Sequence, residues 1–292
     1  MTFSIVACDT RAEPSPEWGV AVASKFLAVG AVVPWAAAGA GAVATQAFAN
    51  LSYGPRGLEA LARGEAAEEV VRRLTEEDDE REQRQLGIVD AQGRAATFTG
   101  SECFSWAGGV RGDGFCCQGN ILTGPDVVDR MAETFSATPG DLASRLLAAL
   151  RAGDEAGGDK RGRQGAALLV VREGGGYGGG TDKALDLRAD DHPRPVEELD
   201  RLLDLHRLYF PRPSDLRFVD IDEELANRLR RLLSAAGYDP RSEAGPYDQG
   251  LRDALYAYMG TENLEERWSE DAKIEAAVLD HLTSTDASRG TR

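Results

Sequence analysis

Short apolar runs separated by polar turns occupy much of the chain up to Asn120, a pattern that predicts β-strands. Strands are expected at residues 2–8, 18–25, 41–46, 85–90, 95–100 and 115–119. Asp-Ala-Gln-Gly at 90–93 is typical of a hairpin turn. The uncharged stretch 26–44 is too rich in Ala and Gly for a membrane span and contains Pro34, so we interpret it as two strands with a bend at 33–35.

Helical spacing of apolar residues appears between these groups of strands. Helices are expected from Pro55 onward, at 65–75, at 125–135 and at 139–151, followed by strands at 164–172 and 184–189 and a helix at 196–209. Strands and helices therefore come in groups, without strict βαβα alternation. This order favours an α+β fold in which antiparallel sheets carry layers of helices on their outer faces.

Beyond a Pro-rich linker at 211–214, only helical patterns remain, at 222–236, 249–259 and 270–282. We predict two domains, residues 1–213 and a small all-α domain at 214–285. Residues 286–292 are expected to be a frayed tail. In the all-α domain, Gly237 is expected to end the first helix.

Composition narrows the choice of partners and cofactors. The chain has 292 residues and a net charge of −16, which argues against nucleic acid and against an anionic membrane surface as partners. Four cysteines without a CxxC motif and three histidines favour reduced, buried thiols, and neither a metal nor another cofactor is expected. The first residues carry no basic segment ahead of their apolar run, so we predict no signal peptide and a cytoplasmic location.

Thr2 is the first candidate for chemistry. Removal of Met1 would leave a terminal threonine, whose α-amine has a pKa of about 8 and lies within reach of its own hydroxyl. In a strand, Thr2 and Ser4 face the same way. Lys25, at the end of the second strand, is expected to keep the pKa of the neighbouring amine low. The alternative is that threonine follows the initiator methionine only for reasons of translation and processing.

A family resemblance strengthens the catalytic interpretation. The segments MTFSIVA, WGVAVASKFLAVGAVVPWA, TGSECFSWAGG, CCQGNILTG and AGGDKRGRQGAALLVVREGGGYGG resemble the bacterial domain-of-unknown-function family ten-twenty-eight, over residues 1–209. That family looks like an N-terminal-nucleophile hydrolase, a four-layer αββα sandwich. The resemblance implies that Thr2 is the nucleophile and that amide hydrolysis is the reaction class, but it gives no substrate. We expect cleavage of an amide or related acyl bond in a small molecule or peptide. Gly165 departs from the family, in which a serine usually follows the RGRQ segment.

Two polar segments are candidates for supporting roles. Asn120 is expected to stabilise an oxyanion and Gln118 to bind substrate, although both also suit a strand-end turn. Arg161 is expected to clamp a substrate carboxylate while Asp159 orients it, unless the segment is simply a solvated loop. Trp106 is expected either to line the pocket or to fill the core.

The C-terminal segment LANRLRRLLSAAGYDPRSEAGPYDQGLRDALYAYMG resembles a peptidoglycan-binding domain. We expect a three-helix unit in which Tyr238 or Tyr247 stacks on a sugar. The alternative is a docking or oligomerisation element, and the oligomeric state stays open. If the first domain is not catalytic, the chain is a binding protein that recognises peptidoglycan fragments or a protein partner through the helical domain.

Overall fold

The fold is taken from a computed structural model, which describes residues 2–289. The chain divides into two units, unit 1 at residues 1–202 and unit 2 at 203–292. Each unit has its own hydrophobic core and is described by itself.

The larger sheet of unit 1 is antiparallel and places the first strand of the chain among its central strands. Its strand order is β10-β9-β2-β1-β8-β7. The strands are β1 (Thr2–Asp9), β2 (Glu17–Ser24), β7 (Gly108–Gly112), β8 (Phe115–Asn120), β9 (Gly165–Val171) and β10 (Lys183–Ala189). Nearly every residue of β1, β2, β8 and β9 is buried, which explains their almost continuous apolar sequences.

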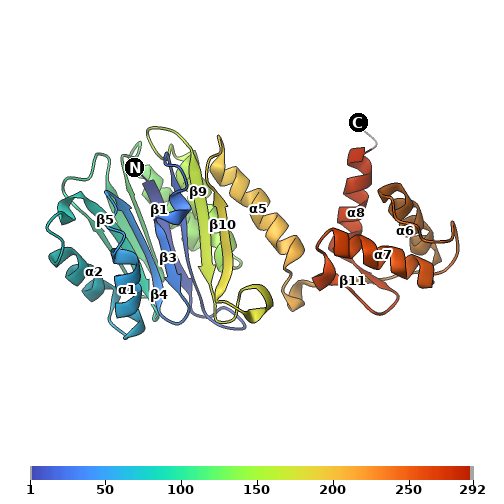
Figure 1. Cartoon of the computed structure of the whole chain (residues 1–292). Coiled ribbons are helices and arrows are strands. Elements are labelled where there is room, and N and C mark those ends of the chain that lie inside the picture. The colour runs from blue at the N-terminus through green and yellow to red at the C-terminus, as the bar shows by residue number, and fades with distance from the viewer. Residues whose placement is uncertain (1, 290–292) are drawn as a thin grey trace. The chain divides into compact units, whose positions relative to one another are not determined.

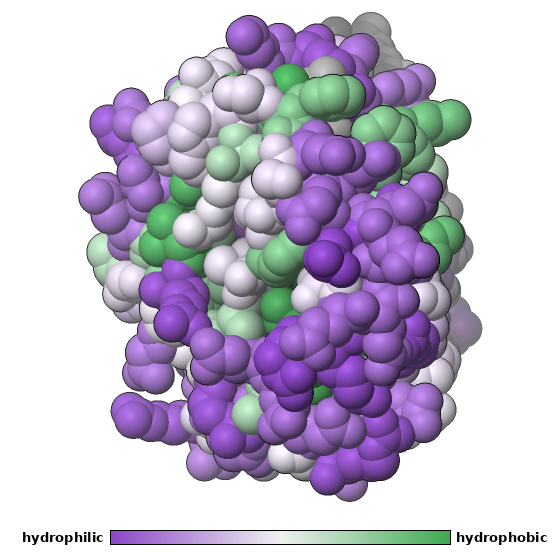
Figure 2. Space-filling view, turned by 90° about the vertical axis from the view of Figure 1, so that its left-hand side faces the viewer, coloured by the Kyte–Doolittle hydropathy of each residue, from purple (hydrophilic) through white to green (hydrophobic). Residues whose placement is uncertain are grey.

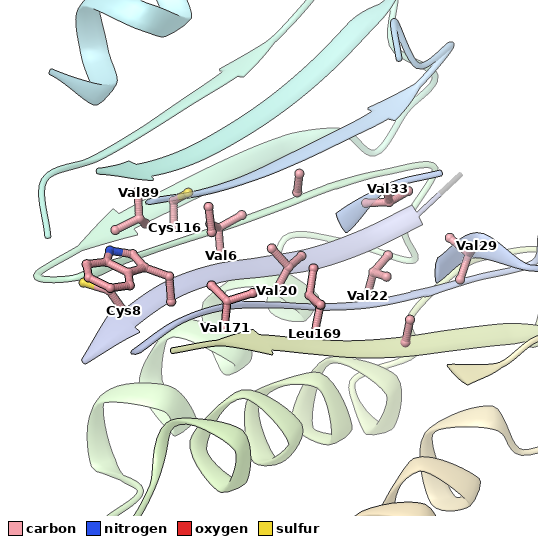
Figure 3. Close-up of a cluster of buried hydrophobic side chains, with 14 residues drawn as sticks. Val6, Cys8, Val20, Val22, Val29, Val33, Val89, Cys116, Leu169 and Val171 are labelled. Carbon is pink, nitrogen blue, oxygen red and sulfur yellow. The ribbon is translucent and has the colours of Figure 1, made fainter. Parts of the chain in front are cut away.

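A four-stranded antiparallel sheet, ordered β3-β4-β5-β6, stacks on the larger one. Its strands are β3 (Pro34–Ala37), β4 (Gly41–Ala47), β5 (Arg84–Asp90) and β6 (Ala95–Thr99). Between the sheets, Val6 and Val20 of the larger sheet pack in one buried cluster with Val89 of the smaller one (Figure 3). Side chains that alternate along each strand therefore fill the space between the sheets.

Helices cover the outer faces of both sheets (Figure 1). α1 (Tyr53–Ala62) and α2 (Ala67–Glu76) pack on the smaller sheet, while α3 (Asp126–Ala137) and α4 (Leu142–Glu155) pack on the larger one. Figure 2 shows the side of the molecule on which α1 and α2 lie, where hydrophilic side chains predominate and apolar ones form smaller patches. The four-layer αββα arrangement expected from the sequence is confirmed. α5 (Pro195–Tyr209) runs from unit 1 into unit 2.

The structure differs from the expectations for unit 1 in three places. Residues 26–33 are not a strand: Ala28 has a φ of 52° and Val29–Ala31 form a 3₁₀ turn, so only β3 and β4 arise from the uncharged stretch. The expected helix at 65–75 begins later, at Ala67, because Gly64 with a φ of 86° separates it from α1. The Gly-rich strand β7 was not predicted, and it forms by pairing with β8.

Unit 2 is a three-helix unit that also contains a short antiparallel pair of strands, which are far apart in the sequence. Its elements are β11 (Phe218–Asp220), α6 (Glu223–Ala236), α7 (Gln249–Thr261), β12 (Lys273–Glu275) and α8 (Ala276–Arg289). The two strands were not predicted, and pairing with β11 delays the start of the last helix to Ala276. Gly237 ends α6 with a φ of 96°, as predicted. Helix α8 continues to Arg289, into the expected tail, and residues 290–292 lie outside the described residues.

Arg230 organises the irregular segment between α6 and α7. It is 1% exposed, although it is an arginine. Its guanidinium donates to the carbonyl oxygens of Pro240, Ser242 and Pro246 at 3.3, 3.4 and 2.7 Å, and it forms an ion pair with Asp248 at 3.0 Å. A buried cation that is paired and hydrogen-bonded in this way fixes the path of the segment.

No helix within residues 2–289 is both long enough and apolar enough to span a bilayer.

Candidate functional site

The first residue of β1 lies at the end of the sheet, in a polar environment. The Thr2 Oγ1 atom is 3.1 Å from the Ser24 Oγ atom at the end of β2, and Asn120 on β8 is its cross-strand partner. Thr2 is 5% exposed. Like Ser4, it shares a strand face with Val6, which packs against the smaller sheet, so both hydroxyls are directed between the two sheets.

Next to Thr2, glutamine side chains of the smaller sheet form hydrogen bonds with residues of the larger sheet. Gln46 of β4 accepts from the Ser4 hydroxyl at 2.7 Å through Oε1. Its Nε2 atom donates to the Thr2 carbonyl oxygen at 3.3 Å and to the Gln85 Oε1 atom at 2.8 Å. The network contains no charged side chain, so its rigidity comes from hydrogen bonds between neutral groups.

Gln85 of β5 is the centre of this network. Its Nε2 atom donates to the Gly119 carbonyl oxygen at 2.8 Å and to the Thr99 hydroxyl at 2.9 Å. Its Oε1 atom accepts from the Asn120 Nδ2 atom at 2.9 Å, in addition to the bond from Gln46. Gln85 therefore fixes the orientation of the Asn120 amide beside Thr2.

Gln118 belongs to the same network. Its Nε2 atom donates to the Ser4 hydroxyl at 2.7 Å. Its buried Oε1 atom has no hydrogen-bond partner among the described residues and lies over Gly87, where a Cβ atom would be only 2.2 Å away. The structure thus brings together three residues chosen from the sequence, namely Thr2, Gln118 and Asn120.

Sequence reasoning missed Ser24, Gln46 and Gln85. All three are buried polar residues at or near the ends of mostly apolar strands, such as GAVATQA and RQLGIVD. A buried polar side chain in such a strand needs a partner and is a usable sign of a site. The identity of that partner depends on how the two sheets stack.

Asp159 forms a second cluster, in contact with Lys25, the residue that follows Ser24. The carboxylate is almost fully buried and accepts the backbone N–H groups of Lys25 at 2.8 Å and Arg161 at 2.9 Å. It also accepts from the Arg161 guanidinium at 3.0 Å. The guanidinium is partly exposed and held in one orientation, so it could receive an anionic group.

Lys25 was expected beside Thr2, and its side chain lies on the opposite face of the sheet, the one that carries Ala23 and its cross-strand partner Phe3. Strand β2 ends at Ser24, which shares a face with Thr2, and Lys25 follows the last strand residue. Its side chain is exposed, and the Nζ atom donates to the Arg163 carbonyl oxygen at 3.3 Å. The alternation of side chains along β2 is the physical reason for this difference.

Trp106 is partly buried, and its backbone pairs with that of Leu122 beyond the end of β8. Its ring lies against Gly108 of β7, where a Cβ atom would be 2.7 Å from the ring. The indole therefore packs on the edge of the larger sheet.

A cavity of about 580 Å³ opens on the other face of the larger sheet. Phe3 and Ala23 contribute apolar surface to it, while Lys25 and Arg163 contribute charge. Arg163 is paired with Asp154 at 2.8 Å. Phe3 points away from the side on which the Thr2 hydroxyl lies, so the part of the cavity next to Phe3 lies across β1 from the glutamine network. Ser24 and Asp159 also line the cavity, at the end of β2 beside Thr2.

Exposed apolar side chains border the Thr2 end of unit 1. They lie on the segments that follow β2 and β4 and on the loop before β7, are 49–61% exposed, and comprise Phe26, Leu27, Phe48, Leu51 and Phe104. We call them the apolar rim. The rings of Phe48 and Phe104 meet edge to face with centroids 6.2 Å apart, and the Phe104 carbonyl oxygen accepts from the Ile121 N–H group at 2.9 Å. The rim is therefore tied to the residue that follows Asn120.

Asp78 holds the segment that carries part of this rim. Its Oδ2 atom accepts from Asn50, from the Tyr53 hydroxyl and from Arg84, at 2.9, 2.8 and 3.1 Å. Burial alone would raise the pKa of Asp78, but these hydrogen bonds prevail and hold it well below its usual range. Burial and the contact with Asp78 raise the pKa of Tyr53.

Within residues 2–289, His, Cys, Asp and Glu side chains form no group of three or more that could hold a metal ion.

The comparisons with known proteins follow the division into units. A family model described as "Putative peptidoglycan binding domain" matches residues 209–282, while no curated protein matches the chain. The crystal structure of protein SPO2555 from Silicibacter pomeroyi is similar, with a TM-score of 0.64 and 34% identity over 70% of this chain and 86% of that one. That structure is assigned to DUF1028, and the model "Family of unknown function (DUF1028)" matches residues 2–199 of the present sequence. The chain therefore belongs to the DUF1028 family.

Proposed function

We propose that unit 1 is an N-terminal threonine amidohydrolase, with Thr2 as its nucleophile once Met1 has been removed. One observation carries the proposal. The Thr2 hydroxyl lies at the start of a central, buried strand, 3.1 Å from a second hydroxyl on Ser24, beside an Asn120 amide that Gln85 holds in place. A nucleophile, a neighbouring proton-transfer group and an amide donor are the parts that acyl transfer requires.

The reaction follows from the atoms of Thr2. Its Oγ1 atom attacks the amide carbonyl carbon while the hydroxyl proton passes to the Thr2 α-amine, directly or through the Ser24 hydroxyl. The C–N bond then breaks as the amine returns the proton to the leaving nitrogen, and an ester on Thr2 remains. Water, deprotonated by the same amine, attacks the ester carbonyl carbon. The bond from that carbon to Oγ1 then breaks, the amine returns the proton to Oγ1, and the carboxylic acid leaves.

Asn120 supplies the electrostatic stabilisation in this proposal. One N–H of its side-chain amide is used by Gln85, and the second N–H is available for the oxyanion. Because Gln85 is itself held by Gly119 and Thr99, the Asn120 donor needs little reorganisation during the reaction.

The substrate class follows from the surroundings of Thr2. The apolar rim suits a substrate with an apolar group close to the scissile amide, since exposed apolar side chains next to polar groups are typical of binding sites. Arg161, oriented by Asp159, provides a position for a carboxylate. We infer an amide that combines an apolar group and an acidic group.

A second function is proposed for unit 2, the binding of peptidoglycan fragments. It rests on the family match over residues 209–282. If unit 1 is inactive, this binding would be the function of the whole chain.

Two measurements test the catalytic proposal. Intact mass must show loss of Met1, because its retention would leave the amine in the wrong place and refute the mechanism. Purified protein is then incubated with a library of acyl amides and muropeptides, and products are identified by mass spectrometry. Thr2→Ala is expected to lose activity at least 100-fold, and Thr2→Ser is expected to retain part of it.

Thr10→Ala is the matched control, because Thr10 is exposed just beyond β1. It should leave turnover unchanged. Equal turnover by the wild type and Thr2→Ala would show that Thr2 is not the nucleophile.

A further inference from the structure

Tyr238 and Tyr247, the aromatic residues that the sequence suggested for sugar binding, pack against the hydrophobic cluster of unit 2. Tyr238 and Tyr258 meet edge to face with ring centroids 5.6 Å apart, and Tyr238 packs on the hydrophobic cluster of the unit. Tyr247 packs on the same cluster, and its hydroxyl is buried. Neither Tyr238 nor Tyr247 is therefore the most open aromatic surface of the unit.

Tyr256 is the exposed aromatic residue of α7. It is 57% exposed, more than any other large hydrophobic side chain described in unit 2. Its ring meets that of Trp268 with centroids 5.0 Å apart and planes inclined at 73°. Trp268 is partly buried against the hydrophobic cluster, so this packing holds the aromatic pair in place.

Two charged side chains border the pair. Arg252 lies one helical turn before Tyr256, and its guanidinium is 5.9 Å from the centre of the Trp268 ring. It forms an ion pair with Glu270. The Glu270 carboxylate also accepts from the Trp268 indole N–H at 3.1 Å, which fixes the orientation of the indole.

The arrangement matches the chemistry of a pyranose ring. Such a ring has faces made of C–H groups, which pack on aromatic surfaces, and a periphery of hydroxyl groups and, in amino sugars, acetamido groups. Arg252 offers N–H donors and Glu270 offers acceptors next to the aromatic surface. Because Trp268 is already held by Glu270, little side-chain entropy is lost when a ligand binds.

We propose that Tyr256 and Trp268, bordered by Arg252 and Glu270, form a saccharide-binding surface for the glycan strand of peptidoglycan. The proposal rests on the peptidoglycan binding proposed for unit 2, and the match over residues 209–282 is the reason for choosing a glycan as occupant. It adds the residues that contact the ligand and the part of the polymer that is recognised, the sugar rings and not the stem peptides.

The test uses the full chain and co-sedimentation with insoluble peptidoglycan over a range of polymer concentrations. Tyr256→Ala is expected to weaken binding about tenfold, whereas Tyr256→Phe keeps the ring and should bind within about twofold of the wild type. Phe218→Ala is the matched control, because Phe218 is another exposed aromatic of the same unit, 41% exposed, on β11. Thermal unfolding of each variant verifies that the unit remains folded.

Competition identifies the part of the polymer that binds. Soluble N-acetylglucosamine oligomers are expected to displace the wild type, and free stem peptides are not. Wild-type binding that Tyr256→Ala leaves unchanged, or that only stem peptides displace, would overturn the saccharide surface while peptidoglycan binding itself stands. A wild type that does not sediment with peptidoglycan would refute the binding function proposed for unit 2 and this surface with it.

Discussion

Replacing Gln85 by leucine removes the centre of the glutamine network without a large change of volume. Gln85 is fully buried and joins the two sheets through its side-chain amide. The substitution deletes the bonds to Gly119, Thr99, Gln46 and Asn120, all between 2.8 and 2.9 Å, and a longer one to Gly108 at 3.2 Å.

The expected cost is the sum of four good hydrogen bonds, reduced by the gain in apolar burial. Each neutral hydrogen bond contributes about 1 kcal/mol net, and a buried donor left without a partner costs about 1–3 kcal/mol. Asn120 loses the acceptor of its Nδ2 atom, whereas Gln46 can still donate to the Thr2 carbonyl oxygen. The leucine side chain recovers about 1–2 kcal/mol. We therefore expect Gln85→Leu to lower the free energy of unfolding by about 3–6 kcal/mol.

Thermal unfolding followed by tryptophan fluorescence measures this effect, because Trp18, Trp35 and Trp106 all lie in unit 1. At roughly 2–4 °C per kcal/mol, the midpoint should fall by about 10 °C. Gln92→Leu is the matched control, since Gln92 is exposed in the turn after β5 and its midpoint should move by less than about 2 °C. Equal midpoints for Gln85→Leu and Gln92→Leu would refute the view that this network stabilises the stacked sheets.

Two further predictions concern titratable groups. The folded state holds the pKa of Asp78 below its usual range, so the stabilising contribution of this carboxylate is complete above about pH 4 and is lost as the pH falls toward the lower folded-state pKa. Asp78→Asn should therefore lower the free energy of unfolding in urea by about 2 kcal/mol at pH 7 and by progressively less below pH 4. A difference between the wild type and the variant that stays constant with pH would contradict the assignment. Burial raises the pKa of Cys8 to about 12 and also raises that of Cys103, but Cys8 is buried whereas Cys103 is partly exposed. Iodoacetamide at pH 8 should therefore label Cys103 well before Cys8 in the native protein, as peptide mass spectrometry would show, and equal labelling rates would mean that Cys8 is not enclosed.

The sequence predicted the strands that have a clear hydrophobic pattern of their own. β1, β2, β8 and β9 are continuous apolar runs that are buried on both faces, and their positions were predicted to within a few residues. β7, with the sequence GGVRG, has no such pattern, because it exists only through its pairing with β8. The stacking of the two sheets came from the family resemblance and not from the periodicity, and the order of the strands was not predicted.

The same distinction applies to the candidate site. Thr2 could be chosen from the sequence because removal of Met1 would make it terminal, and Asn120 because a polar Gln-Gly-Asn segment follows an apolar strand. Gln46 and Gln85 were missed, since their contacts with the larger sheet depend on the stacking of sheets that are distant in sequence. Lys25 was expected beside Thr2, but Ala23 pairs with Phe3, so Lys25, which lines the same cavity as these two residues, lies on the face opposite the Thr2 hydroxyl.

The interactions of Arg230 have an evolutionary consequence for the segment between α6 and α7. Its guanidinium contacts three main-chain oxygens, those of Pro240, Ser242 and Pro246, and these atoms are present whatever side chains the segment carries. Homologues should therefore diverge freely in the composition of this segment while they preserve its length and the single arginine. Substitution of that arginine alone would leave the peptide oxygens without their common donor, a loss that no change within the segment could easily repair.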